Sequence, residues 1–151
     1  MIRTFNPRIP LLWLAACCLC LLAVACNEED DADIFVGRTW KVGNLFGANG
    51  RPVLSEEQAN TVAREDCFYI RFENMTNFIG RTLDKNFSGT WYVDLKNRKL
   101  TLNFKDTGHP SDALSRQVTK ALQNTDSYEG DYNFLKLKEA ESTAYVLCRP
   151  Y

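Results

Sequence analysis

The sequence contains a single histidine, His109, and lacks the short motifs that carry most hydrolytic and nucleotide chemistry. One histidine excludes most zinc sites and histidine dyads. There is no G-x-S-x-G nucleophile elbow and no phosphate-binding P-loop. Asp106-Thr107-Gly108 spells the aspartic-protease triplet, but that chemistry needs two carboxylates about 3 Å apart. We interpret the triplet as a turn and predict no catalytic residue, no cofactor and no metal site.

An excess of charge of one sign is also missing. The chain has 18 basic and 19 acidic residues, and five of the acids lie in residues 27–33. Residues 34–151 hold 16 basic and 14 acidic residues, a net charge of +2. Nucleic-acid binding needs a concentrated basic surface, so we predict that nucleic acid is not a partner.

The first 25 residues have the composition of a secretory signal. Arg3 and Arg8 precede 17 uncharged residues, from Ile9 to Ala25, which end in small side chains. This order of a basic start, an apolar stretch and a small-residue exit is typical of a signal peptide. The apolar stretch is shorter than the roughly 20 residues of a membrane span. An uncleaved membrane helix is the alternative.

The exit of this segment, Leu22-Ala23-Val24-Ala25-Cys26, resembles the lipobox of bacterial lipoproteins. The resemblance implies cleavage before Cys26 and lipid attachment to its thiol and new amino group. Two or three acyl chains pass the threshold for stable membrane anchoring. Ordinary cleavage after Ala25 is the alternative, and it would leave an exposed, oxidisable thiol.

Residues 26–33 (CNEEDDAD) are predicted to form an acidic tether. Asn27 follows the cysteine where an aspartate retains Gram-negative lipoproteins in the inner membrane. The resemblance therefore implies an outer-membrane location. The acidic cluster also resembles a surface-export signal of some Gram-negative lineages. The protein is thus expected to face the periplasm or the cell surface.

Two cysteines remain beyond the leader, Cys67 and Cys148. Both lie in strand-like stretches, and an even pair in an oxidising compartment favours a disulfide. Such a bridge would close a loop of about 80 residues and stabilise the fold by roughly 3–4 kcal/mol. The alternative is two buried free thiols that behave as small hydrophobic groups.

Residues 34–151 are predicted to form one mainly β (α+β) domain. Alternating apolar residues indicate strands, which we place at 38–45, 68–73, 76–83, 87–95, 99–104, 133–138 and 143–149. Capping patterns indicate a short helix from Ser55 and a second from about Ser111 or Asp112 to Gln123. We expect a small antiparallel barrel or sandwich of about seven or eight strands, with the amphipathic second helix covering an open end or edge.

The stretches FVGRTWKV (35–42), SGTWY (88–92) and LTL (100–102), with the closing pair FLKL (134–137) and YVL (145–147), resemble META-domain and lipocalin-like lipoproteins. The resemblance implies a β-barrel and supplies no catalytic residues. A ligand calyx is not expected, because about 118 residues leave little volume beyond a filled core.

Two functions from different classes follow. The first is a lipid-anchored, non-enzymatic binding or structural module with a protein, glycan or small-molecule partner. The second is a small lipid-anchored hydrolase that uses surface carboxylates. An exposed group of Tyr69, Tyr92, Tyr128 and Tyr132 would favour the first, and two close carboxylates with one raised pKa would favour the second.

Overall fold

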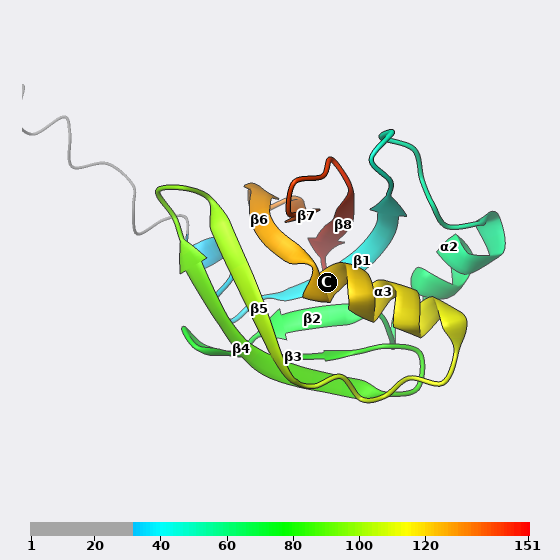
Figure 1. Cartoon of the computed structure of the whole chain (residues 1–151). Coiled ribbons are helices and arrows are strands. Elements are labelled where there is room, and N and C mark those ends of the chain that lie inside the picture. Colours follow the sequence, from blue (N-terminus) through cyan, green and yellow to red (C-terminus); the bar gives the residue numbers. More distant parts are fainter. Residues whose placement is uncertain (1–31) are drawn as a thin grey trace, which may run out of the picture.

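The computed structural model describes residues 32–151, and its eight strands close into one antiparallel barrel (Figure 1). The predicted signal peptide 1–25, Cys26 and most of the tether lie outside the described residues. Each strand pairs with the next along the chain, and the last pairs with the first. The strands are β1 (Thr39–Phe46), β2 (Tyr69–Phe72), β3 (Asn77–Arg81), β4 (Asn86–Asp94), β5 (Lys99–Asp106), β6 (Thr125–Gly130), β7 (Leu135–Glu139) and β8 (Tyr145–Pro150). The predicted fold class is confirmed, and its barrel alternative is the correct one.

The strands form where the sequence alternates apolar and polar residues. In the long hairpin of β4 and β5, Phe87, Trp91, Leu100 and Leu102 are buried, while Tyr92 between them is exposed. This two-residue period places one apolar set inside the barrel and leaves the other set in water. Strand β1 has a β-bulge at Gly43, where its register against β8 shifts between Val42 and Asn44.

Strand β6 was not predicted. Its sequence, TDSYEG, is polar, and only Thr125 and Tyr128 are buried. The alternation is interrupted because the register against β7 shifts between Thr125 and Ser127. This strand pairs with β5 at one position, Lys99 with Ser127, and thereby closes the barrel.

Both helices begin where the capping patterns place them. In α2 (Glu56–Val62), Ser55 Oγ accepts a bond from the amide of Gln58, and the Gln58 side chain accepts one from the amide of Ser55. In α3 (Ala113–Gln123), Asp112 accepts a bond from the amide of Ser115. No helix within residues 32–151 is long and apolar enough to cross a membrane.

Helix α3 covers one end of the barrel (Figure 1). Its apolar face buries Leu114, Val118 and Leu122. Ser115 Oγ accepts a bond from the amide of Leu83, in the turn between β3 and β4, which holds the helix across this opening. The expectation that this helix covers an open end is confirmed.

The chain ahead of β1 closes the opposite end. After the short 3-10 helix η1 (Ala32–Ile34), Phe35 is fully buried between the rings of Phe72, Trp91 and Tyr128, at centroid distances of 5.1, 5.4 and 4.9 Å. Trp40 Nε1 donates a hydrogen bond of 2.8 Å to the carbonyl of Ile34. With both ends covered and the interior filled by aromatic and aliphatic side chains, the barrel wall is the surface that faces outward.

Replacing the end-closing ring tests this arrangement. We expect Phe35→Ala to lower the free energy of unfolding by about 3–5 kcal/mol, because it leaves a cavity among three aromatic rings. Urea unfolding measures the change. Tyr92→Ala, at an aromatic side chain that is 68% exposed, is the control and should stay within about 0.5 kcal/mol of wild type. Equal effects of the two substitutions would contradict the account.

Candidate functional site

The most unusual side chain of the barrel wall is Lys41 in β1. It lies on the outer face of the strand, opposite to the inward Trp40 and Val42, yet only 5% of it is exposed. Its ammonium group donates hydrogen bonds to the carbonyls of Val62, at 2.6 Å, and of Cys67. Carbonyls at a helix C-terminus have no partner within the helix and form its negative end. Lys41 therefore ties the end of α2 and the following loop onto β1.

The strand register places further cations beside Lys41. Arg149 of β8 lies directly opposite Lys41, and Tyr69 of β2 lies opposite it on the other side. Arg81 of β3 lies opposite Tyr69 in the same row. Residues directly opposite in an antiparallel pair project from the same face of the sheet. The outer wall thus carries a row of three cations and one tyrosine across four strands. These four residues lie far apart in the sequence.

A cleft opens at this row. It has a volume of about 350 Å³ and is lined by Lys41, Ala63, Glu65, Arg149, Pro150 and Tyr151; we name it the Lys41 cleft. The Tyr151 hydroxyl donates to the carbonyl of Glu65, and its ring meets Tyr69 edge to face at 5.7 Å. One tyrosine ring and two cations therefore line the cleft, and Tyr69 packs against that ring.

Neither cation of this cleft forms an ion pair with a carboxylate of residues 32–151. The ion pairs described within residues 32–151 join Arg64 to Asp66, Lys99 to Asp126, and Glu129 to both Lys136 and Lys138. Burial lowers the pKa of Lys41, Cys67 raises it, the facing Arg149 lowers it, and the nearby charge of Asp66 raises it; the pKa as a whole is lowered. Like charges directly opposite each other on a sheet are unfavourable. The cleft is a place where an added anion would be stabilised.

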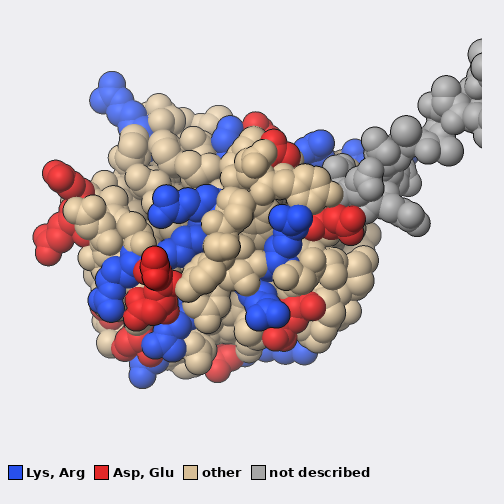
Figure 2. Space-filling view, turned by 180° about the vertical axis from the view of Figure 1, so that it is seen from behind, with Lys and Arg blue, Asp and Glu red and all other residues tan. Residues whose placement is uncertain are grey.

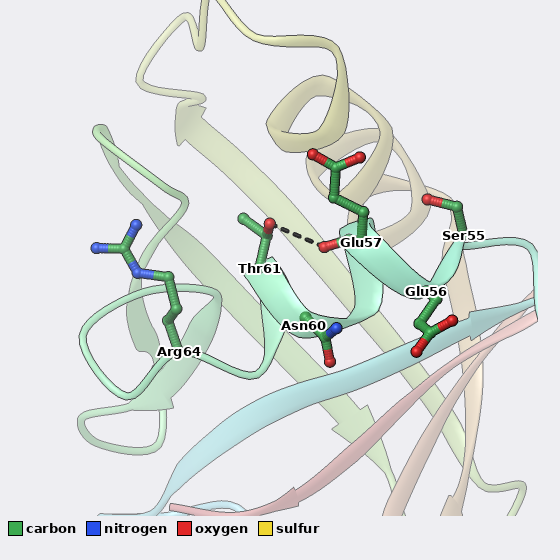
Figure 3. Close-up of a pocket in the computed structure, with 6 residues that line it drawn as sticks. All are labelled: Ser55, Glu56, Glu57, Asn60, Thr61 and Arg64. Carbon is green, nitrogen blue, oxygen red and sulfur yellow. Dashed lines mark hydrogen bonds between the residues drawn. The ribbon is translucent and has the colours of Figure 1, made fainter.

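The hollow along α2 is larger but differs in character (Figure 3). It has a volume of about 680 Å³ and is lined by Ser55, Glu56, Glu57, Asn60, Thr61 and Arg64. Figure 3 shows these side chains spreading apart from the short helix, with Thr61 donating to the carbonyl of Glu57. All except Thr61 are exposed, so water already solvates every group that a ligand would meet.

A third hollow lies where α3 meets β1, β7 and β8. It has a volume of about 220 Å³ and is mostly apolar, with Leu45, Val53, Ala121 and Val146 among its lining residues. The stacked rings of Phe46 and Tyr145, 4.7 Å apart, form one side. This groove contains no buried charged group, and we do not assign it a ligand.

Cys67 and Cys148 are both buried free thiols, so the favoured disulfide is absent from the structure. The two thiols cannot meet because they lie on opposite sides of strand β1. Cys148 pairs with Val42 and faces the barrel interior, whereas Cys67 Sγ lies under the end of α2, 3.8 Å from the carbonyl of Thr61. The wall of the barrel separates the two side chains.

The remaining candidate residues do not converge. Asp106 accepts a bond from the amide of Gly108, which has a φ of +70°, so the triplet forms the turn we predicted. Residues 32–151 contain no group of three or more His, Cys, Asp or Glu side chains that could hold a metal. Tyr128 is buried, Tyr92 is exposed on β4, and the Arg38 guanidinium lies 4.5 Å from the Tyr132 ring, so the four tyrosines form no common patch.

The charge distribution agrees with the near-neutral composition. Figure 2, which shows the molecule from behind, has Lys and Arg interspersed with Asp and Glu rather than gathered into one basic field. A binding surface on this wall is therefore local, limited to one cluster of cations, and suits a small anionic group better than a long polyanion.

The closed eight-stranded barrel, with covered ends and a cationic cleft on its wall, defines a small β-barrel domain. The chain belongs to the DUF4847 family, a domain of unknown function whose model matches residues 27–150. It is similar to the crystal structure of a DUF4847 family protein from Bacteroides vulgatus ATCC 8482. The two share 27% sequence identity with a TM-score of 0.64, over 78% of this chain and 95% of that one. No curated protein matches the chain.

The bonds of Lys41 make it a structural residue as well. We expect Lys41→Met to lower the free energy of unfolding by about 1–3 kcal/mol, because two carbonyls lose their charged donor. Hydrogen exchange should also speed up at the amides of α2 and its following loop. Lys105→Met, at an exposed position of β5, is the control and should change neither quantity. Wild-type stability and exchange in the Lys41 variant would contradict this role.

The buried thiols predict an alkaline loss of stability. Burial raises the pKa of Cys148 from 9.0 to about 12, so the folded state favours the neutral thiol. Stability from this group is complete below pH 9 and falls by about 1.4 kcal/mol per pH unit between pH 9 and 12, because the unfolded chain releases the proton first. Urea unfolding of wild type and Cys148→Val at pH 8, 9.5 and 10.5 should show a shallower decline in the variant. Parallel declines would refute the effect.

Proposed function

We propose that this protein is a lipid-anchored envelope lipoprotein whose barrel is a non-enzymatic binding module. In this proposal residues 1–25 are removed as a signal peptide, Cys26 carries the lipid, residues 26–33 form the tether, and residues 34–151 are the single folded domain. The proposed location is the Gram-negative outer membrane, facing the periplasm or the cell surface.

One observation carries the binding function. The barrel interior is filled and both ends are covered, whereas the outer wall holds a cleft with a buried ammonium group and a facing guanidinium that lack carboxylate partners in the described residues. Burying charge costs free energy unless it is compensated. Such a site is expected in a module that binds a partner on its surface rather than in a calyx.

The family match supports the proposed processing. It begins at residue 27, directly after Cys26, and leaves out the segment that we propose is removed. The lipobox resemblance of residues 22–26 supports the anchor. The resemblance of the barrel to META-domain and lipocalin-like lipoproteins stays a prediction.

Three carboxylates of the described residues have a lowered pKa, which is the opposite of what the hydrolase alternative needs. A carboxyl general acid needs a raised pKa. Hydrogen bonds from Asn97 lower the pKa of Asp94, and the bond and charge of Lys136 lower the pKa of Glu129. Burial raises the pKa of Asp112, but its hydrogen bonds with Ser115 outweigh this effect, so its pKa is lowered as well. These directions support the binding module over the hydrolase.

Lipid attachment is testable in cells. We expect the wild-type chain to incorporate labelled palmitate and to partition into detergent, and Cys26→Ala to do neither. Val24→Ala, a small-for-small change within the proposed lipobox, is the matched control and should keep the label. Protease treatment of intact cells then separates the two faces, since a surface protein is cut before the outer membrane is permeabilised. Equal labelling of wild type and Cys26→Ala would contradict the anchor.

A further inference from the structure

We propose that the Lys41 cleft is a carboxylate-binding site, and that its ligand carries one carboxylate on a body about the size of a single ring. This inference rests on the proposed binding function and names its ligand class.

The cleft has hydrogen-bond donors that suit a carboxylate. An ammonium group has three N–H donors, and Lys41 uses two of them for the carbonyls of Val62 and Cys67. Lys41 also lines the cleft, and its two bonds leave one N–H donor over. Arg149 lies directly opposite and carries a planar fork that matches a carboxylate. A buried ammonium group and an exposed guanidinium thus belong to neighbouring residues of the same cleft.

The net charge of the lining side chains favours a monoanion. The side chains that line the cleft carry two positive charges, from Lys41 and Arg149, and one negative charge, from Glu65. A carboxylate brings one negative charge next to Glu65 and a phosphate dianion brings two, so Glu65 opposes the monoanion less than the dianion. A bound anion also offsets the desolvation and the Arg149 repulsion that lower the pKa of Lys41.

The size and apolar lining of the cleft suit a ligand with one ring. A volume of about 350 Å³ lies at the small end of ligand sites, which holds one ring and its substituents. Ala63, Pro150 and the ring of Tyr151 supply apolar contact, and Tyr69 supports that ring edge to face. The ring of Tyr151 is also 64% exposed, so a ligand gains contact by covering it.

Two sources share this chemistry, a free small carboxylate and a uronate residue within an acidic polysaccharide. The row of the wall distinguishes them. Arg81 lies two strands away from Lys41, about 10 Å at the usual strand spacing, beyond the reach of a single ring. A polymer that binds the cleft would extend across Tyr69 to Arg81, and a small molecule would not.

The experiment titrates the protein with benzoate, D-glucuronate and polygalacturonate, followed by the amide shifts of the ¹⁵N-labelled full domain. Benzamide is the neutral match of benzoate, and phenyl phosphate is the dianionic match. Arg149→Gln removes the exposed donor without touching the bonds of Lys41, and Arg51→Gln in the loop after β1 is the control. Arg81→Gln reports on the polymer.

We expect at least one carboxylate to shift the amides of Lys41, Arg149 and Tyr151, and benzamide and phenyl phosphate to bind at least tenfold more weakly. Arg149→Gln should weaken carboxylate binding at least tenfold, and Arg51→Gln should not. Weakening of polygalacturonate by Arg81→Gln identifies the polymer as the source, and its absence identifies the small molecule.

No carboxylate binding at millimolar concentration, shifts at another face, or equal binding by Arg149→Gln would each overturn the proposal. These outcomes leave lipid attachment at Cys26 unaffected, because palmitate labelling measures it separately. A wild-type chain that incorporates no palmitate, in turn, refutes the anchor and leaves the carboxylate site unaffected.

Discussion

The structure depends on one geometric constraint, which is that eight strands close around an interior only wide enough for side chains. Trp40, Phe72, Phe78 and Trp91 fill that interior, while Phe35 and α3 cover its two ends. Side chains that are not part of the core therefore lie on the outer wall of the barrel or in the loops that pack against it. The position of Lys41 follows directly, since an outward residue of β1 becomes buried only because α2 and its loop pack over that strand.

Burying an ammonium group opposite a guanidinium is costly, and its hydrogen bonds repay only part of the cost. The carbonyls of Val62 and Cys67 satisfy two donors of Lys41, but within residues 32–151 it forms no ion pair with a carboxylate. The same contacts hold the end of α2 and its following loop against β1, beside the cleft. The stability of the loop and the affinity of the cleft are thus two consequences of one side chain, and an anion would strengthen both.

Local patterns in the sequence predicted most of the fold. The alternation of β4 and β5, the capping box at Ser55 and the cap at Asp112 are each written within a few residues. Strand β6 escaped because its polar sequence has no intact alternation. The site escaped for a different reason, since Lys41 and Arg149 are 108 positions apart and become neighbours only through the register of β1 and β8. The same long-range geometry places Cys67 and Cys148 on opposite sides of the barrel wall. The presence of two cysteines in strand-like stretches of sequence did not indicate this separation.

A barrel with a filled interior can contact a partner only at its outer surface, and we propose that the Lys41 cleft is the contact site. The most direct measurement is the anomalous diffraction of a crystal soaked with 4-bromobenzoate, because the bromine signal locates the ligand. The account predicts the bromine in the cleft and the carboxylate against Arg149 and Lys41. Bromine in the groove beside α3, or in the barrel interior, with the cleft empty, would contradict it.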